Sequence, residues 1–138
     1  MVDKYVLDAC ALVAFIKQEP GFDIVRDIFI KASEGKAEIS MNKLNLLEVH
    51  YGIQRVEGHA KTALVYEMIL RLPILVNDCM RDDVFHEASR IKSSYRMSLA
   101  DAIALGEAST MDATLITSDH HEFDIVEANE NIKFKWIR

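Results

Sequence analysis

The sequence predicts an α/β layer fold with a mainly parallel sheet. Short apolar runs alternate along the chain with longer segments of helical periodicity, an order typical of parallel sheets whose strands are joined by helices. Only five glycines and two prolines interrupt the 138 residues, and we find no repeat, linker or low-complexity segment. A chain of this length is near the usual size of one domain. We therefore expect residues 1–138 to form a single domain.

Short apolar runs mark the expected strands. They are residues 5–7, 37–40, 74–76, 114–117 and 132–137. The first of them ends at Asp8, and the third follows Pro73. Runs of this length and composition are typical of strands that are buried on both faces.

Helices are expected between these runs. They cover residues 11–17, a segment from Pro20 to Gly35, and residues 44–56, 59–72, 82–95 and 98–111. Pro20 suits the first turn of its helix, and Gly35 suits its end. The helix over residues 59–72 stops before Pro73. The polar residues after Thr117 indicate a loop.

Three of these helices carry a pattern that predicts burial. The helix over residues 44–56 is strongly apolar. The helix over residues 98–111 is rich in alanine and apolar on nearly every side, which is typical of a buried helix whose small side chains allow close packing. The helix over residues 82–95 is expected to turn one apolar stripe inward, made of Val84, Phe85, Ala88 and Ile91.

Four carboxylates stand out against this pattern. Asp8 and Asp119 each follow an expected strand, and parallel strands would bring both to the same edge of the sheet. Glu48 and Asp101 lie within helices that are expected to be buried. An isolated buried carboxylate costs several kcal/mol unless it is partnered or neutralised. A divalent cation bound by all four is one economical solution, and hard oxygen ligands suit Mg²⁺ or Mn²⁺ better than Zn²⁺.

Each carboxylate also has an ordinary structural interpretation. Asp8 and Asp119 can be helix N-caps that follow strands. Asp101 lies three residues after Ser98, the spacing of a capping box. Glu48 can be a solvated helix residue. Taken singly these interpretations are reasonable, but together they require four separate coincidences.

Composition excludes several other classes of protein. No apolar run approaches the roughly 20 residues of a membrane-spanning helix, and no signal peptide is expected at the N-terminus. Cys10 and Cys79 are too few for a disulfide framework and lack the spacing of metal ligands, so a cytoplasmic location is expected. The net charge of −6 argues against binding a nucleic-acid duplex through broad phosphate neutralisation.

The sequence resembles the PIN-domain proteins, and among them the VapC-type toxins, along essentially its whole length. Residues 5–12, Tyr-Val-Leu-Asp-Ala-Cys-Ala-Leu, resemble the first acidic motif of that family. Residues 45–49, Asn-Leu-Leu-Glu-Val, resemble the second, and residues 98–102, Ser-Leu-Ala-Asp-Ala, resemble the third. Residues 115–119, Leu-Ile-Thr-Ser-Asp, followed by His-His-Glu-Phe, resemble the last. Each motif alone is weak, whereas four in this order are fairly specific.

The resemblance implies a three-layer PIN-like fold and a Mg²⁺- or Mn²⁺-dependent endoribonuclease. Its acidic set would be Asp8, Glu48, Asp101 and Asp119, all four holding the metal, with Glu48 binding it directly or holding a water. Asn45 and Thr117 match polar positions that accompany the acids.

The implied partners are a single-stranded or looped RNA, a second copy in a homodimer, and a cognate antitoxin. For the dimer surface, Phe22, Phe29, Tyr66 and Met68 are candidates. The chain departs from the family where small hydroxyl or amide residues commonly follow the first aspartate, because it has Ala9 and Cys10 there.

Two other functions remain open from sequence. One is a non-catalytic α/β module that binds a partner through a degenerate acidic site, which the Ala9-Cys10 departure favours. The other is a phosphoacceptor receiver-like domain, although the adjacent acidic pair of such domains is missing before Asp8. Metal-stimulated RNA cleavage separates the nuclease from both.

Overall fold

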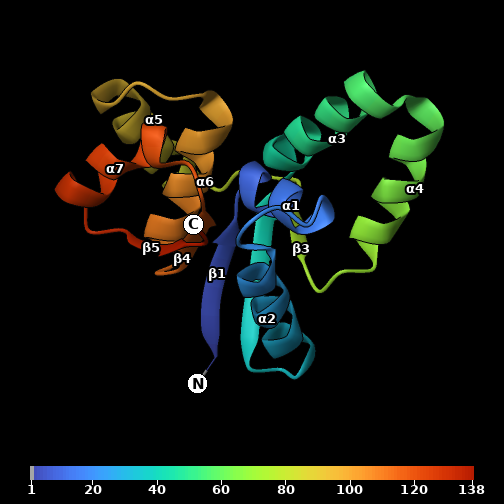
Figure 1. The fold of residues 1–138 in the computed structure, drawn as a ribbon. Helices are drawn as coiled ribbons and strands as arrows, with labels where there is room; N and C mark the ends of the chain where they lie inside the picture. Colours follow the sequence, from blue (N-terminus) through green and yellow to red (C-terminus); the bar gives the residue numbers. More distant parts are fainter. Residues whose placement is uncertain (1) are drawn as a thin grey trace.

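A computed structural model describes residues 2–138 as alternating strands and helices (Figure 1). The strands are β1 (Asp3–Leu7), β2 (Ala37–Asn42), β3 (Leu75–Asn77), β4 (Thr114–Thr117) and β5 (Lys133–Trp136). The helices are α1 (Ala9–Ile16), α2 (Phe22–Ser33), α3 (Lys43–Glu57), α4 (His59–Leu70), α5 (Asp82–Ser94), α6 (Leu99–Thr110) and α7 (His120–Asn129).

The strands form one sheet in the order β3-β2-β1-β4-β5, and every pairing within it is parallel. The predicted α/β fold with a mainly parallel sheet is therefore confirmed. From the central β1 the chain builds outward through β2 and β3, then crosses to the other side of β1 to add β4 and β5. The strand order thus reverses between β1 and β4, and in open α/β sheets the crevice at such a reversal is where ligands bind.

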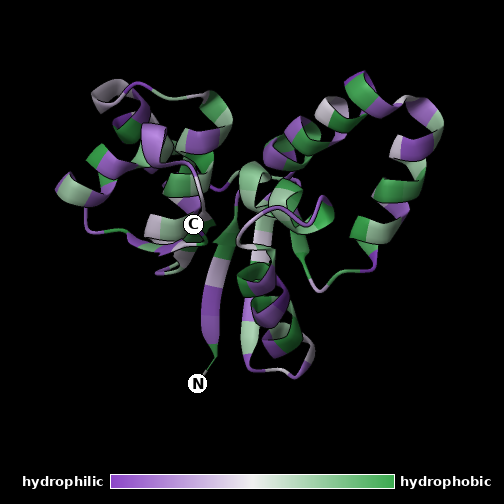
Figure 2. Ribbon diagram, viewed as in Figure 1, coloured by the Kyte–Doolittle hydropathy of each residue, from purple (hydrophilic) through white to green (hydrophobic). Residues whose placement is uncertain are grey.

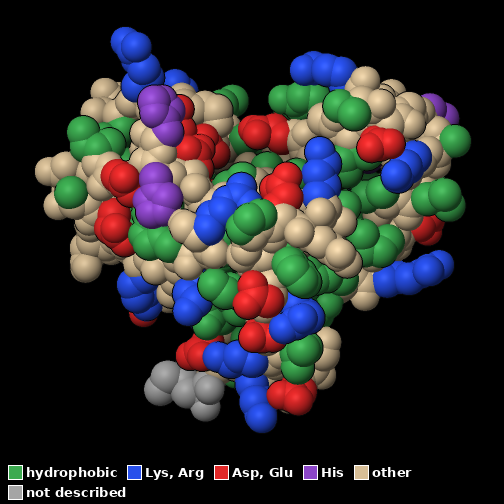
Figure 3. All heavy atoms as spheres, viewed as in Figure 1, with side chains coloured by type: hydrophobic (Ala, Val, Ile, Leu, Met, Phe, Trp, Pro, Cys, Tyr) green, Lys and Arg blue, Asp and Glu red, His purple; other side chains and the backbone are tan. Residues whose placement is uncertain are grey.

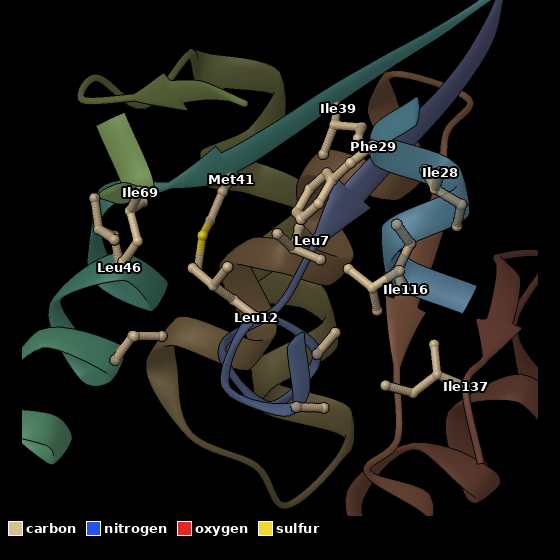
Figure 4. Packing of buried hydrophobic residues seen from close by; sticks show 14 of the residues in the cluster. Leu7, Leu12, Ile28, Phe29, Ile39, Met41, Leu46, Ile69, Ile116 and Ile137 are labelled. Atoms are coloured by element: carbon tan, nitrogen blue, oxygen red, sulfur yellow. The ribbon is translucent and has the colours of Figure 1, made fainter. Parts of the chain in front are cut away.

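Side chains that alternate along the strands divide the core into two halves. Leu7 and Ile116 pack with the buried residues of α1–α4 on one face of the sheet. Their neighbours Val6 and Leu115 pack with those of α5–α7 on the other face. Figure 2 shows β1 turning from hydrophilic at its start to hydrophobic at its end, and Figure 4 shows Leu7, Ile39 and Phe29 meeting between the sheet and α2. The expected three layers are present.

Helices α5 and α6 approach each other closely at Gly106. A Cβ added there would lie 3.1 Å from the backbone nitrogen of Ala88 and 3.2 Å from the carbonyl oxygen of Val84. The small residues of α6 thus allow the close packing that its composition predicts, and the helix is buried along most of its length. This contact also selects which side of α5 faces inward.

Several expectations about elements are wrong. The polar segment after Thr117 is helix α7, because Asp119 caps it and Phe123 and Val126 anchor it in the core. Phe85 is 56% exposed, because α5 packs on α6 through Val84, Ala88 and Ile91. Pro20 lies before α2, which Gly21 begins in a left-handed conformation.

The expectation that the helix over residues 44–56 is buried is also wrong in part. Its buried face is made of Asn45, Leu46, Val49 and Ile53. The opposite face is apolar but exposed, as Leu47 at 52% illustrates. This helix is therefore covered on only one side, and apolar side chains remain exposed on the other.

Candidate functional site

The carboxyl ends of β1 and β4 place Asp8 and Asp119 at the point where the strand order reverses. Asp8 is buried, and its Oδ1 accepts a hydrogen bond of 2.9 Å from the backbone nitrogen of Ala11. Asp119 is half-buried, and its Oδ1 accepts one of 3.2 Å from the backbone nitrogen of Glu122. Both residues are therefore helix N-caps, as the ordinary interpretation predicts, and capping leaves the second carboxylate oxygen of each available.

Thr117 connects the two strand ends. It is buried, and its Oγ1 accepts a hydrogen bond of 3.0 Å from the backbone nitrogen of Asp119. Burial raises the pKa of Asp8 to about 6, against the lowering effect of hydrogen bonds from Thr117, Ala11 and Cys10. The negative charge of Asp119 raises it further. Asp8 is thus an acid held where its charge is poorly stabilised.

Cys10 occupies the position at which the sequence departs from the family pattern. Its Sγ lies 3.2 and 3.3 Å from the two carboxylate oxygens of Asp8 and accepts a hydrogen bond from Ser118. Burial and the charge of Asp8 raise the pKa of the Cys10 thiol to about 11. The thiol therefore keeps its proton at neutral pH and donates it to Asp8, weakly compared with a hydroxyl.

Asp101 and Glu48 come from the helices on opposite faces of the sheet. Asp101 is in the first turn of α6, where its backbone nitrogen donates to Ser98 Oγ at 3.1 Å, so its own carboxylate is not needed as a cap. Burial raises the pKa of Asp101 to about 7, and the charges of Asp8, Glu48 and Asp119 raise it as well. Glu48 is half-buried, and burial raises its pKa.

The four carboxylates therefore share one electrostatic environment. Among residues 2–138 none of them forms an ion pair with Lys, Arg or His. In the described chain no three His, Cys, Asp or Glu side chains lie close enough together to hold a metal ion. The charges of Asp8, Glu48 and Asp119 all act on Asp101, and the charge of Asp119 acts on Asp8. Figure 3 shows acidic side chains along the hollow between the α3–α4 half and the α5–α7 half of the molecule.

This donor set suits a divalent cation with a preference for oxygen. Asp8, Glu48 and Asp101 have raised pKa values and no cationic partner in the described part of the chain, so a bound Mg²⁺ or Mn²⁺ would stabilise their charge. Zn²⁺ fits less well, because it favours nitrogen and sulfur ligands, whereas these four are carboxylates. The chemistry of the donor set therefore suits the metal that the sequence predicts.

Asn45 lies one helical turn before Glu48, and its side chain is wholly buried. Within the described residues its amide nitrogen and oxygen have no hydrogen-bond partner. A buried amide without partners is rare and points to a missing water or ligand. This is the strongest structural reason to keep Asn45 among the supporting residues.

The sequence analysis missed Glu107, a second buried acid on α6. Its Oε1 accepts a hydrogen bond of 3.2 Å from Asn42 Nδ2, and its Oε2 accepts one of 3.0 Å from Asn77 Nδ2. Burial raises its pKa. Asn42 caps α3, because its Oδ1 accepts a hydrogen bond from the backbone nitrogen of Asn45. Glu107 therefore links α6 to the start of the helix that carries Glu48. The sequence shows Glu107 as the second charged residue of the Ala-rich helix, beside Asp101.

Glu107→Ala should lower the free energy of unfolding by about 1–3 kcal/mol, because it leaves the buried Asn42 amide without an acceptor. Glu107→Gln should lower the free energy of unfolding much less. The glutamine oxygen can still accept the hydrogen bond from Asn42, and Asn77 can rotate its amide to accept one from the glutamine nitrogen. Urea unfolding of both variants measures the difference. An alanine variant as stable as the wild type would show that the network contributes nothing.

A pocket of about 540 Å³ lies beside α3, with Leu44, Leu47 and Tyr66 in its wall. None of the four carboxylates lines this pocket. Asp8 is buried, whereas Glu48, Asp101 and Asp119 are half-buried, so solvent reaches the acidic group mainly through these last three.

Comparison with known proteins is consistent with this geometry. The PIN domain family model matches residues 5–129. No curated protein sequence matches the chain.

Three solved toxin–antitoxin structures share the fold. A chain of VapBC2 from Rickettsia felis, crystallised with a promoter DNA fragment, matches with a TM-score of 0.73 and 17% identity over 96% of this chain and 97% of that chain. DNA-bound VapBC from Salmonella typhimurium matches with a TM-score of 0.71 and 17% identity over 100% of both chains. FitAcB from Neisseria gonorrhoeae matches with a TM-score of 0.67 and 15% identity over 96% and 97%.

Proposed function

Because this chain belongs to the PIN-domain family, we propose that it is a metal-dependent endoribonuclease and the toxin of a toxin–antitoxin pair. The observation that carries the proposal is the convergence of Asp8, Glu48, Asp101 and Asp119 on one electrostatic site without a cationic partner. These residues come from four separate segments of the chain. Helix capping explains Asp8 and Asp119 but explains neither Glu48 nor the raised pKa of Asp101.

In this proposal Asp8, Asp101 and Asp119 hold Mg²⁺ or Mn²⁺ directly, and Glu48 holds it directly or through a water. A bound divalent metal supplies water activation and stabilisation of the charge that develops on the phosphate. Ala11 and Thr117 fix the orientation of Asp8. A site of this shape needs an accessible phosphate backbone, which single-stranded or looped RNA offers.

The test is cleavage of a single-stranded RNA by the purified protein. Mg²⁺ or Mn²⁺ should support cleavage, and a chelator should abolish it. Cleavage that persists in chelator would contradict metal dependence. Absence of cleavage with either metal would favour the alternative, a non-catalytic module with a degenerate acidic site, for which the thiol of Cys10 beside Asp8 is the supporting observation.

A cognate antitoxin is the proposed protein partner. The three matched structures named above are complexes with antitoxin-type partners by their names, and this chain covers nearly the whole of each matched chain. An antitoxin would need to cover the acidic site or hold it in an unproductive state. Co-expression with the protein encoded by the adjacent gene tests the pairing.

A homodimer is also part of the proposal. Of the four side chains considered for its surface from sequence, Phe29 is buried in the core, while Tyr66 and Met68 are half-buried and pack against that core. Core packing, the other use that their sequence pattern allows, therefore accounts for these three, and Phe22 is half-buried.

A better surface is the group of exposed apolar side chains Leu44, Met80, Phe85 and Leu99, which line a second pocket of about 470 Å³. They come from the starts of α3 and α6 and from α5 with the segment before it. We propose that a second copy covers this surface. Light scattering that reports only monomer at high micromolar concentration would contradict the dimer.

The proposed location is the cytoplasm. Cys10 and Cys79 are both free thiols, as expected in a reducing compartment. Within residues 2–138 no helix has the length and apolar character needed to cross a bilayer.

A further inference from the structure

Three aromatic side chains form a continuous stack beside the acidic site. Phe134 and Trp136 lie on the same face of β5, with ring centroids 5.4 Å apart and planes within 8° of parallel. The ring of His120, from the start of α7, stacks on Trp136 at 3.9 Å and 12°. His120 is therefore the outermost ring of the stack.

Hydrogen bonds at the ring edges fix two of the three rings, His120 and Trp136. His120 Nδ1 lies 2.8 Å from Asp124 Oδ1, and Nε2 lies 2.8 Å from the carbonyl oxygen of Arg138. Trp136 Nε1 donates to Glu127 Oε2 at 3.0 Å. Both ring nitrogens of His120 and one of its faces are thus occupied, yet its side chain is 50% exposed. The exposed area must belong largely to the second face of the imidazole.

The stack is connected to the acidic site through the backbone. His120 directly follows Asp119, so their Cα atoms are about 3.8 Å apart. Trp136 pairs in the sheet with Thr117, the residue that bonds to Asp119 and contributes to the pKa of Asp8. The stack and the acidic site therefore share the carboxyl ends of β4 and β5.

We propose that the free face of His120 is a stacking surface for one base of a single-stranded RNA whose neighbouring phosphate lies at the acidic site. The inference rests on the proposed function and adds to it the way in which the substrate is held. Every base has a flat π-face, so such a platform binds RNA with little sequence preference. Asp124 and Glu127 contact ring edges and leave the face of His120 free.

The structural alternative is that the stack only fastens the segment after β5 to α7. In that case His120 would affect stability without affecting RNA. The two roles require different side chains at position 120. Stacking on an RNA base needs only a flat aromatic ring, whereas holding the segment after β5 against α7 needs the two hydrogen bonds that the imidazole makes.

The experiment measures binding of a fluorescein-labelled single-stranded RNA by anisotropy in chelator, and KM and kcat for its cleavage with Mn²⁺. His120→Ala should raise Kd and KM about tenfold, a typical cost of losing one stacked base, and leave kcat within about twofold. His120→Phe should restore binding. His120→Gln, which is polar but cannot stack, should bind as weakly as the alanine variant.

His121→Ala is the matched control, because His121 is an exposed histidine of the same helical turn, and the ring that stacks on Trp136 is that of His120. It should bind as the wild type does. A second probe is the same RNA with one abasic position moved along the strand. One position should weaken wild-type binding about tenfold and leave His120→Ala unaffected, since the two changes remove the same contact.

The outcomes separate this inference from the proposed activity. Binding that depends on His120 without any cleavage would overturn the nuclease and support the stacking surface. Two results would overturn the stacking surface alone. One is cleavage by His120→Ala with an unchanged KM, and the other is RNA binding by His120→Phe that is as weak as binding by His120→Gln. No binding or cleavage by the wild type would overturn both.

Discussion

Asp101→Asn is expected to reduce metal-dependent RNA cleavage about a thousandfold while the protein stays folded. A catalytic metal contributes on the order of several kcal/mol to stabilisation of the transition state, and each 1.36 kcal/mol is a factor of ten in rate. Asp101 is the acid on which the charges of the other three act. Its substitution leaves the N-cap of α6 intact, because Ser98 provides that cap. Initial rates with Mn²⁺ and far-UV circular dichroism measure the two effects.

Asp23→Asn is the matched control, because Asp23 also lies in the first turn of a helix, α2, but away from the acidic site. This variant should cleave RNA at the wild-type rate. If Asp101→Asn cleaves as fast as Asp23→Asn, Asp101 does not belong to the site, and the raised pKa of its carboxyl has no catalytic meaning.

The second large effect is on stability: Mn²⁺ should raise the melting temperature by about 10 °C at neutral pH. A ligand at 100 times its Kd that binds only the folded state adds about 2.7 kcal/mol, which corresponds to this shift in a domain of about this size. The four uncompensated carboxylates are the reason that the folded protein should bind the ion. Melting curves in chelator and in millimolar Mn²⁺ make the comparison.

Without metal, stability should rise as the pH falls from 8 towards 5. Asp8 and Asp101 have ordinary pKa values of 3.8 and folded-state values of about 6 and about 7. At pH values between the ordinary and the folded-state pKa, the folded protein binds more protons than the unfolded protein. Ionisation of Asp8 and Asp101 therefore destabilises the fold as the pH rises through 6 and 7. Mn²⁺ should reverse the trend, because protons compete with the ion for the same oxygens.

Asp101→Asn should raise the melting temperature in chelator and reduce the shift that Mn²⁺ produces. Asp8→Ala should instead lower stability, since loss of an N-cap costs about 0.5–2 kcal/mol. A wild-type protein whose melting point is unchanged by Mn²⁺ would contradict the four-carboxylate site and leave Asp8 and Asp119 as helix caps only.

The sequence predicts elements that have a local pattern, such as an apolar run. It does not predict which of two neighbouring apolar residues faces the core, because that depends on packing against another element. The strand that ends at Asp8 and the strand that ends before Asp119 are visible as apolar runs, and their carboxyl ends meet as parallel strands must. Phe85 was misplaced because Val84 and Phe85 are both apolar, and only the close approach of α5 to Gly106 decides which of them faces inward.

The sequence analysis missed two other features, helix α7 and the role of Glu107. Only the first of them has a local signal in the sequence. Asp119 and Glu122 have the spacing of a helix start, and Phe123 and Val126 follow it as an apolar pair, so α7 was detectable. Glu107 was overlooked because its partners, the amides at the ends of β2 and β3, are far away in sequence. No local pattern indicates a contact of that kind.

The central position of β1 has a consequence for how the protein is made. The first strand to leave the ribosome pairs with β2 on one side, but its other partner, β4, begins only at Thr114. Pairing between such distant segments forms late and slowly, and a chain is synthesised at about 5–20 residues per second. Asp8 therefore meets Asp119 only after more than a hundred further residues have been made. A chain cut before Thr114 lacks Asp119 and the second partner strand of β1, so it should not assemble the four-carboxylate site.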